Sequence, residues 1–488
     1  MSTPTQAPPR KILHNRFLSS PAAVDVSSTG QKYIYGRAFW LAYLANAVTM
    51  VAVALLFRYA DFVLFLGGSE FHLGWIVGVG MVGSLFTRLA IGAWLDRYGA
   101  RPLWICSLLL FALTCIAHLA VGSYQCPAIY VLRILYCCAL AGINGASMTF
   151  ISTCGPTRRM AELVGMLGTA GFLGMVVGTL LGDVLLGMLE KDRTEIVVMF
   201  VSAAVLGLLA LPFAWNATKG EPHKASLAPK RACGSSGEKG KISWKAFFHP
   251  RTSPLFSPLA ALGLLRRYLP GPVLLVAVAM GMALGLPGVF LRTFSENLGI
   301  PRLSLFFLVY ALAAIITRVL TRRWAEWFGP RKVILLGLSG LALSLLLFLP
   351  VKSEWMLILP AIGFGCSHAV LFPSVVAAGS VVFPLEHRGL ATVLILAMWD
   401  LGQLLGAPLA GGMVRIAGII NWPAYPLMFS VFAVLLAAVA VWYAIRSSPG
   451  KKTVDFSVES GSNISRASGP KVTGRMVCTP SANCGGKN

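Results

Sequence analysis

Long apolar segments alternate with short polar ones along this chain, and the lengths of the apolar segments predict its fold. Twelve such segments lie at about residues 38–66, 72–95, 102–122, 127–152, 162–189, 195–214, 271–296, 303–322, 332–350, 355–383, 389–416 and 424–446. A helix needs roughly 20 apolar residues to cross a membrane. In lipid, each segment must satisfy its own backbone polar groups, so each is expected to be a helix. The pattern predicts an all-α, polytopic membrane protein with two six-helix bundles.

Polar stretches set the expected domain boundaries. The stretch 215–270 separates six apolar segments from the next six and is expected to be a basic cytoplasmic linker. The bundles are therefore predicted at 38–214 and 271–446. Residues 1–37 and 447–488 are polar and rich in Ser, and they are expected to be cytoplasmic tails. A targeting peptide within 1–37 stays open as an alternative.

Composition supports a membrane protein and explains the strong positive charge. Of the 488 residues, 56% are hydrophobic and 12% are charged, whereas soluble domains carry about 25% charge. The net charge of +23 could indicate nucleic-acid binding. However, 30 Lys and Arg residues fall on one predicted side of the membrane and six on the other. Cytoplasmic loops collect such residues, so we predict cytoplasmic termini in a plasma or inner membrane and no nucleic-acid partner.

The sequence contains no pattern that indicates a cofactor, a metal or an enzyme. The ten cysteines lack the spacing of a zinc site, and most lie inside apolar segments, where they are expected to be reduced. No Gly-Lys-Ser/Thr phosphate-binding loop is present. Movement of a solute would therefore depend on ion or solute gradients.

Two segments repeat without gaps at a distance of 230 residues. Thr87–Arg101 aligns with Thr317–Arg331, and Thr, Arg, Trp, Gly and a final Arg coincide. Both segments end one apolar block and precede the next. Internal repeats are typical of secondary transporters, whose solute site lies between the halves.

The first copy contains Gly92-x-x-x-Asp96-Arg97-x-Gly99-x-Arg101, which resembles the loop signature of the major facilitator superfamily. The resemblance implies a twelve-helix fold, with an ion-paired contact between helix ends that holds one conformation and releases in another. A simple topology anchor is the alternative. The candidate residues of the two copies are Gly92, Asp96, Arg97, Gly99 and Arg101, with Glu326, Gly329 and Arg331.

The fifth apolar segment carries glycines at regular spacing. Gly165, Gly174, Gly178 and Gly182 match the exchanger-type members of this family, although Thr179 and Asp183 replace the expected Pro and last Gly. The resemblance implies export or antiport. Close helix packing is the alternative, because small residues let helices approach.

Polar side chains inside apolar segments are candidate sites, because they are costly in a membrane. Asp400 could take up a proton or pair with an arginine, and His368 could bind solute or relay protons. Asn144 could bond to a solute, and Gln403 follows Asp400 by one turn. For His368 and Asn144, ordinary packing between helices is the alternative.

Arg58 and Asp61 are three residues apart and share a helix face. They could pair with each other or face the cavity together with Arg292. The family resemblance implies that helices one, four, seven and ten line that cavity, which favours these positions.

Arg88 and Arg318 are equivalent residues of the repeat, so they could hold one anion between the halves. This arrangement resembles the nitrate/nitrite branch of the family. In other branches, such an arginine only braces the loop.

The leading prediction is a secondary active transporter that works by alternating access and exports a small organic molecule in exchange for protons. Uptake or exchange of a small anion through Arg88 and Arg318 is the alternative. A sensor on the same fold is a third reading. The expected partners are a small solute, the lipid bilayer and protons, and the chain is expected to be a monomer.

Overall fold

The structure is a computed structural model that describes residues 35–153, 160–187, 192–219, 271–321, 324–383 and 388–447. Within these ranges every element is a helix. Ten helical spans are long and apolar enough to cross a membrane, and two helices of 17 residues, Ser304–Leu320 and Pro330–Leu346, occupy the other two predicted positions. The predicted all-α fold is confirmed. Most of the expected linker and both tails lie outside the described residues.

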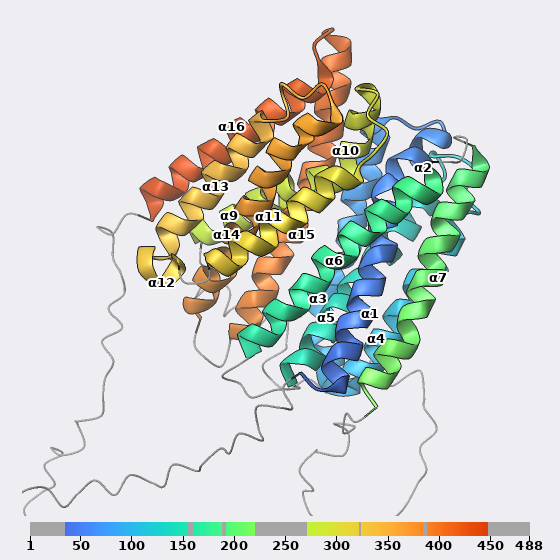
Figure 1. Ribbon diagram of the computed structural model, residues 1–488, viewed down its shortest axis with the longest axis vertical. Helices are drawn as coiled ribbons and strands as arrows, with labels where there is room; N and C mark the ends of the chain where they lie inside the picture. Colours follow the sequence, from blue (N-terminus) through green and yellow to red (C-terminus); the bar gives the residue numbers. More distant parts are fainter. Residues whose placement is uncertain are drawn as a thin grey trace, which may run out of the picture. The chain divides into compact units, whose positions relative to one another are not determined.

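The helices of the N-terminal half pack as one group, and those of the C-terminal half pack as another (Figure 1). The first group is α1 (Arg37–Leu55), η2 (Leu56–Arg58), α2 (Tyr59–Phe65), α3 (Glu70–Tyr98), α4 (Ala100–His118), α5 (Ala128–Thr153), α6 (Met160–Leu186) and α7 (Arg193–Ala217). The second is α9 (Gly271–Leu284), α10 (Leu286–Asn297), α11 (Ser304–Leu320), α12 (Trp324–Phe328), α13 (Pro330–Leu346), η7 (Glu354–Leu357), α14 (Ile358–Val381), α15 (Arg388–Ile419) and α16 (Ala424–Arg446). Both groups belong to one compact unit that ends at Ser447.

The repeat seen in the sequence extends through the fold. Helices α4 and α13 begin at Ala100 and Pro330, and α5 and α14 begin at Ala128 and Ile358, so both pairs keep the offset of 230. Packing is also equivalent: α4 lies against α5 and α7, as α13 lies against α14 and α16. The two halves are therefore copies of one helical arrangement.

The first helix of each half is interrupted at the same position. A 3₁₀ turn at Leu56–Arg58 separates α1 from α2, and Gly285 separates α9 from α10 just before Pro287. The single helices expected at 38–66 and 271–296 are thus each two helices. Pro287 explains the second break, because its ring clashes with the preceding turn and it lacks an N–H.

The two halves meet closely along α3 and α15. A Cβ placed on Gly78 of α3 would lie 2.6 Å from Cδ of Pro408 and 2.8 Å from the Leu404 carbonyl oxygen. A Cβ on Gly411 of α15 would lie 2.6 Å from the Glu70 carbonyl oxygen. Backbone therefore meets backbone along this seam. A second contact between the halves joins α6 and α11.

The two loop motifs of the repeat build equivalent turns at the end of the fold where α1 begins and α16 ends, which we call the basic end. Gly99 and Gly329 have φ of +81° and +79°, values that favour glycine. Beyond these turns, Arg101 lies 3.9 Å above the ring of Trp215 in the last turns of α7. Arg331 donates to the Ala444 carbonyl oxygen at the end of α16.

Each of these arginines thus binds the last helix of its own half. The side chains of Asp96 and Glu326, expected to form an ion-paired contact between helix ends, lie outside the described residues.

Candidate functional site

A cavity of about 500 Å³ lies between the two halves. Its charged and titratable wall includes Arg88 and Arg133 from the N-terminal half and His368 and Asp400 from the C-terminal half. Aromatic rings cover much of the rest of the wall: Phe57, Tyr136, Phe172, Phe306, Phe307, Tyr310 and Trp399. The cavity therefore combines an apolar surface with a few polar groups, which is the usual composition of a small-molecule site.

Asp400 of α15 is bound across the interface by two residues of α3. Its carboxylate accepts hydrogen bonds from Ser84 Oγ at 2.6 Å and from Arg88, whose Nε and Nη2 both donate to it. Asp400 is 3% exposed. A buried carboxylate in a membrane needs such partners, so this ion pair is a polar link between the halves.

His368 of α14 is held by Tyr310 of α11 through a hydrogen bond of 2.5 Å between Nδ1 and Oη. The rings of Phe172, Phe372 and Trp399 surround the imidazole at centroid distances of 5.8–5.9 Å. Phe172 comes from α6, so this aromatic cluster also draws on both halves.

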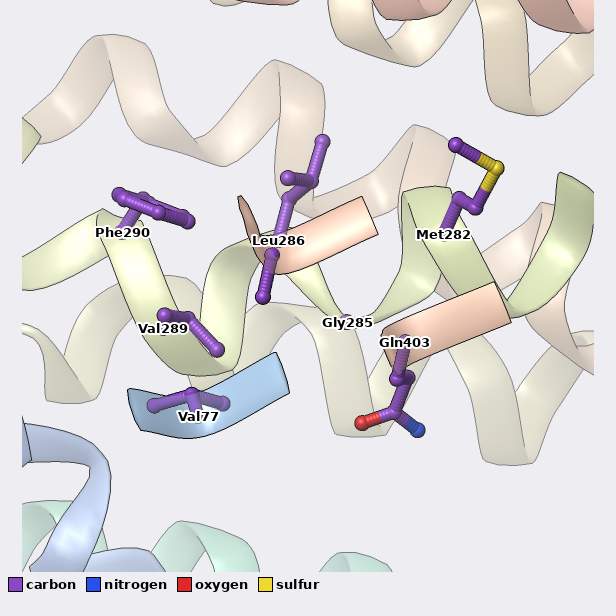
Figure 2. Close-up of a pocket in the computed structure, with 8 residues that line it drawn as sticks. Val77, Met282, Gly285, Leu286, Val289, Phe290 and Gln403 are labelled. Carbon is purple, nitrogen blue, oxygen red and sulfur yellow. The ribbon is translucent and has the colours of Figure 1, made fainter. Parts of the chain in front are cut away.

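Two neutral polar residues complete the predicted set in the wall. Asn144 on α5 is exposed toward the cavity, and Gln403 on α15 lies one turn beyond Asp400. Figure 2 shows Gln403 beside the break at Gly285, where a smaller crevice is lined by Val77, Met282 and Val289. The break in the seventh span therefore makes room for a polar side chain next to the cavity.

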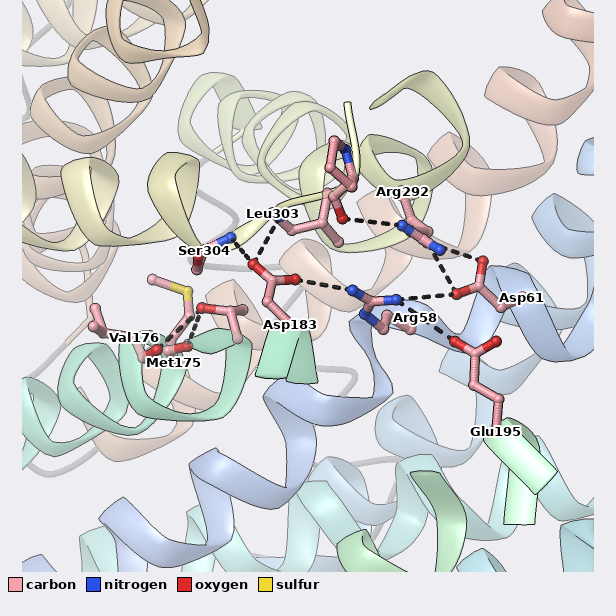
Figure 3. Close-up of polar contacts among 11 residues, drawn as sticks. Arg58, Asp61, Met175, Val176, Asp183, Glu195, Arg292, Leu303 and Ser304 are labelled. Atoms are coloured by element: carbon pink, nitrogen blue, oxygen red, sulfur yellow. Dashed lines mark hydrogen bonds and ion pairs between the residues drawn. The ribbon is translucent and has the colours of Figure 1, made fainter. Parts of the chain in front are cut away.

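An ion-pair network lies beyond the cavity, toward the end opposite the basic end, where the first span ends. Arg58 is at its centre (Figure 3). Its Nη2 atom donates to Asp183 Oδ1 at 2.9 Å, and its Nη1 atom lies 3.6 Å from Glu195 and 3.8 Å from Asp61. The side chains of these four residues are nine-tenths or more buried. The network is therefore shielded from solvent, and ion pairs in such a buried environment are stronger than ion pairs on a surface.

The same network ties the two halves together at two points. Nε of Arg292, on α10, donates to both carboxylate oxygens of Asp61 at 2.9 and 3.0 Å. The Oδ2 atom of Asp183 accepts the backbone N–H groups of Leu303 and Ser304 at 3.0 and 2.8 Å. These groups form the N-terminal end of α11, where a helix dipole favours negative charge. One turn nearer the cavity, the rings of Phe57 and Phe307 pack at 4.9 Å. The cavity is thus closed on this side.

The structure brings five of the predicted residues to the cavity: Arg88, Asn144, His368, Asp400 and Gln403. Arg58, Asp61 and Arg292, which could have faced it, instead form the network. The structure does not bring Arg88 and Arg318 to one site: Arg88 lines the cavity and is paired with Asp400, whereas Arg318 is outside the cavity wall and its guanidinium lies 5.7 Å from the Phe172 ring.

The glycines of the fifth span have different environments. A Cβ on Gly174 or Gly178 would lie 2.5 Å from a carbonyl oxygen of α1. Gly182 has looser contact with Leu55 at 3.5 Å, and nothing lies within 4 Å of a Cβ on Gly165. Two of the four therefore let α6 pack on α1.

Four site residues were not singled out as candidates from the sequence: Arg133, Asp183, Glu195 and Tyr310. Asp183 had a signal, since it replaces a glycine with a carboxylate inside an apolar segment. Glu195 lies in the first turn of α7, after the N-cap Asp192, and has the sequence pattern of an ordinary first-turn acid. Among the described residues, no group of three or more His, Cys, Asp or Glu side chains could hold a metal ion.

Comparison with known families agrees with the resemblance in the loop motif. The profile described as "Major Facilitator Superfamily" matches residues 38–305 and 273–480. Multidrug resistance protein 2 of Bacillus subtilis (strain 168) is 30% identical over 139 residues, which are 28% of this chain and 34% of that protein. The multidrug transporter MdfA of Yersinia pestis bv. Antiqua (strain Angola) is 25% identical over 147 residues, 30% and 34% of the two chains. The chain thus spans about a third of the length of these relatives.

Solved structures share the fold over most of the chain. The nucleoside transporter NupG superposes with a TM-score of 0.64 at 14% identity, covering 84% of this chain and 98% of that chain. A bacterial homologue of the human lysosomal transporter Spinster, in an inward-facing and unoccupied conformation, gives a TM-score of 0.61 at 15% identity, covering 86% and 97%. At these identities the likeness concerns the fold alone.

Proposed function

The chain belongs to the major facilitator superfamily, and on that premise we propose that it exports a small organic solute in exchange for protons. It is a multi-pass membrane transporter rather than an enzyme. The observation that carries the proposal is the carboxylate of Asp400, which lines the cavity and is bound by Arg88 of the other half. A proton and a conformational change would act on the same group.

Protonation of Asp400 would remove the charge that holds Arg88. The link between α3 and α15 would weaken, because hydrogen bonds to an ionised acceptor are roughly twice as strong as neutral ones. The two halves could then rock along their glycine seam. Binding of the proton would in this way favour one of the two conformations, as alternating access requires.

The ion-pair network would act as the barrier on the other side of the membrane. We place the basic end in the cytoplasm of a plasma or inner membrane, because Arg and Lys residues favour cytoplasmic loops. The state described here would then be closed to the outside by Asp61–Arg292 and by Asp183 at the end of α11. The names of the two relatives, a multidrug resistance protein and a multidrug transporter, support the transport of small organic molecules.

The test uses purified protein in proteoliposomes with an acidic lumen. Two impermeant probes, ethidium and 2-naphthalenesulfonate, are added outside in parallel experiments. An exchanger releases protons from the lumen and accumulates at least one probe above its external concentration. Asp400→Asn should lose this accumulation but keep probe-for-probe exchange, because the neutral side chain cannot carry a proton yet keeps an acceptor for Arg88.

Glu70→Gln is the matched control, because Glu70 begins α3 away from the cavity wall. It should accumulate the probe as the wild type does. Accumulation that survives in Asp400→Asn would remove Asp400 as the coupling site. A wild-type protein that exchanges both probes without responding to the pH gradient would end the proposal of proton coupling.

A further inference from the structure

The cavity wall contains a buried arginine that has no counter-ion. Arg133 of α5 is 9% exposed and lines the cavity. Its guanidinium lies over the rings of Tyr59 and Tyr136 at 4.3 and 4.7 Å. Its Nε atom has no hydrogen-bond partner, and among the described residues no carboxylate is paired with this side chain. Aromatic faces attract a cation, but they leave its N–H groups without acceptors.

The fold makes room for this side chain across α3. A Cβ on Gly80 would lie 2.5 Å from Cγ of Arg133, so only a glycine leaves the arginine in its present position. In the C-terminal half, the residues 230 positions later are Tyr310 and Gly363. The large and small residues have thus exchanged places, and this arginine site exists in the N-terminal half alone.

The charges in the cavity wall do not balance. Arg88 and Asp400 neutralise each other, and His368 is bonded to Tyr310. Arg133 remains as one uncompensated positive charge in a buried, largely apolar wall. Such a charge is strongly unfavourable unless it is paired. An anion arriving in the cavity would supply the missing partner.

We infer that Arg133 binds the anionic group of the transported solute, and that this solute is a small organic anion with an aromatic or apolar body. This rests on the proposed function as a transporter. The planar guanidinium suits a carboxylate or sulfonate, which it binds with two parallel hydrogen bonds. The rings of Phe57, Phe172 and Trp399 in the same wall provide contact for the apolar body.

The experiment measures equilibrium binding to the purified, full-length protein by isothermal titration calorimetry. The probes are 2-naphthalenesulfonate and its neutral analogue 2-naphthalenesulfonamide, which differ in charge at nearly constant shape. The wild type should prefer the sulfonate by at least about tenfold, the factor that corresponds to about 1.4 kcal/mol. Arg133→Gln should remove this preference, and Arg133→Lys should keep part of it, since the charge remains while the two-pronged geometry is lost.

Two further variants separate binding from folding. Gly80→Ala retains Arg133 but should displace its side chain, because the added methyl group would lie 2.5 Å from Cγ of Arg133. The preference should therefore fall while the charge of the protein is unchanged. Arg415→Gln removes an arginine that also lies over an aromatic ring, Phe71 at 4.7 Å, but is outside the cavity wall, and the preference should persist. Without probe, Arg133→Gln should unfold at a temperature no lower than the wild type, because an uncompensated charge has been removed.

A wild type without sulfonate preference, or an Arg133→Gln variant that retains it, would overturn the inference. A lower unfolding temperature of Arg133→Gln with an unchanged preference would assign Arg133 to packing against Tyr59 and Tyr136. Proton-driven accumulation of at least one probe in proteoliposomes is a separate measurement that does not depend on this preference, so failure of the anion site is distinguishable from failure of the exporter proposal.

Discussion

Asp183→Ala should shift the protein toward the conformation that is open at the end opposite the basic end. Asp183 lies in the N-terminal half, and its Oδ2 atom accepts two backbone N–H groups of the C-terminal half, from Leu303 and Ser304. Alanine removes both bonds between the halves. Arg58 keeps Asp61 and Glu195 as neighbours at 3.8 and 3.6 Å, so no isolated buried charge results and the fold should survive.

The size of the shift follows from these contacts. A hydrogen bond to a charged acceptor contributes about 1.5–3 kcal/mol. Two such bonds at the lower end of this range amount to about 3 kcal/mol, which changes an equilibrium constant by about 150-fold. A closed state that is favoured about 100-fold in the wild type would therefore become comparable in population to the open state.

Spin labels would measure the two populations. Phe65 on α2 is 47% exposed and Trp355 in η7 is 73% exposed, and they lie at this end in different halves. In a background without native cysteines, labels at these positions should give one main distance in the wild type and a second, longer one of similar weight in Asp183→Ala. Asp183→Asn keeps one acceptor oxygen and should show an intermediate effect.

Asp192→Asn is the matched control, because the Asp192 side chain caps α7 by accepting the backbone N–H groups of Thr194 and Glu195, both in its own half. Its distance distribution should be that of the wild type. An unchanged distribution in Asp183→Ala would refute the assignment of this network as a barrier, since the bonds between the halves would then carry no conformational energy.

Three further changes test other parts of the fold by thermal unfolding of the purified protein. Gly78→Val should destabilise the seam by about 1–3 kcal/mol through overpacking, whereas Gly418→Ala, with nothing within 4 Å of its Cβ, should not; equal stability of both would contradict the close approach. Tyr310→Phe should cost about 1–3 kcal/mol by leaving His368 unpaired, and an unaltered midpoint would mean that water replaces the hydroxyl. Arg331→Met should lower the free energy of unfolding by a similar amount through loss of its bonds to the end of α16. An unchanged midpoint would mean that solvent already satisfies that end.

The spans were predictable because a membrane imposes one requirement on every spanning segment: enough apolar length and internally paired backbone. That requirement is local, so the sequence located twelve apolar spans and the offset of 230. The break at Gly285 has a visible cause in Pro287. The 3₁₀ turn at Leu56–Arg58 has no glycine or proline and was not predictable, because tertiary packing and not local propensity ends α1 there.

The ion-pair partners of the candidate residues were harder to predict than the places of these residues in the spans. Asp400 and Arg88 were both identified as candidates, but they are 312 residues apart, and no local pattern states that α3 and α15 meet. Pairing with an arginine was one of two alternatives for Asp400, whereas the alternatives for Arg88 were an anion held together with Arg318 or a brace for the loop. Asp183 departs from a glycine pattern. Only the fold reveals that this carboxylate reaches the first turn of α11.

The seam between α3 and α15 has a mechanical consequence. Pro408 has no N–H, so the Leu404 carbonyl oxygen lacks its usual partner one turn later, and Gly78 lies directly against it. Contacts between a Cα–H group and a carbonyl oxygen are weak and tolerate changes in angle, unlike interlocked side chains. At Gly78 and Gly411 the two helices therefore meet without side chains of their own, and a small rotation there would exchange one such contact for another at little cost. The glycines would allow α3 and α15 to rotate against each other, while the ion pairs between the halves would stabilise one conformation over the other.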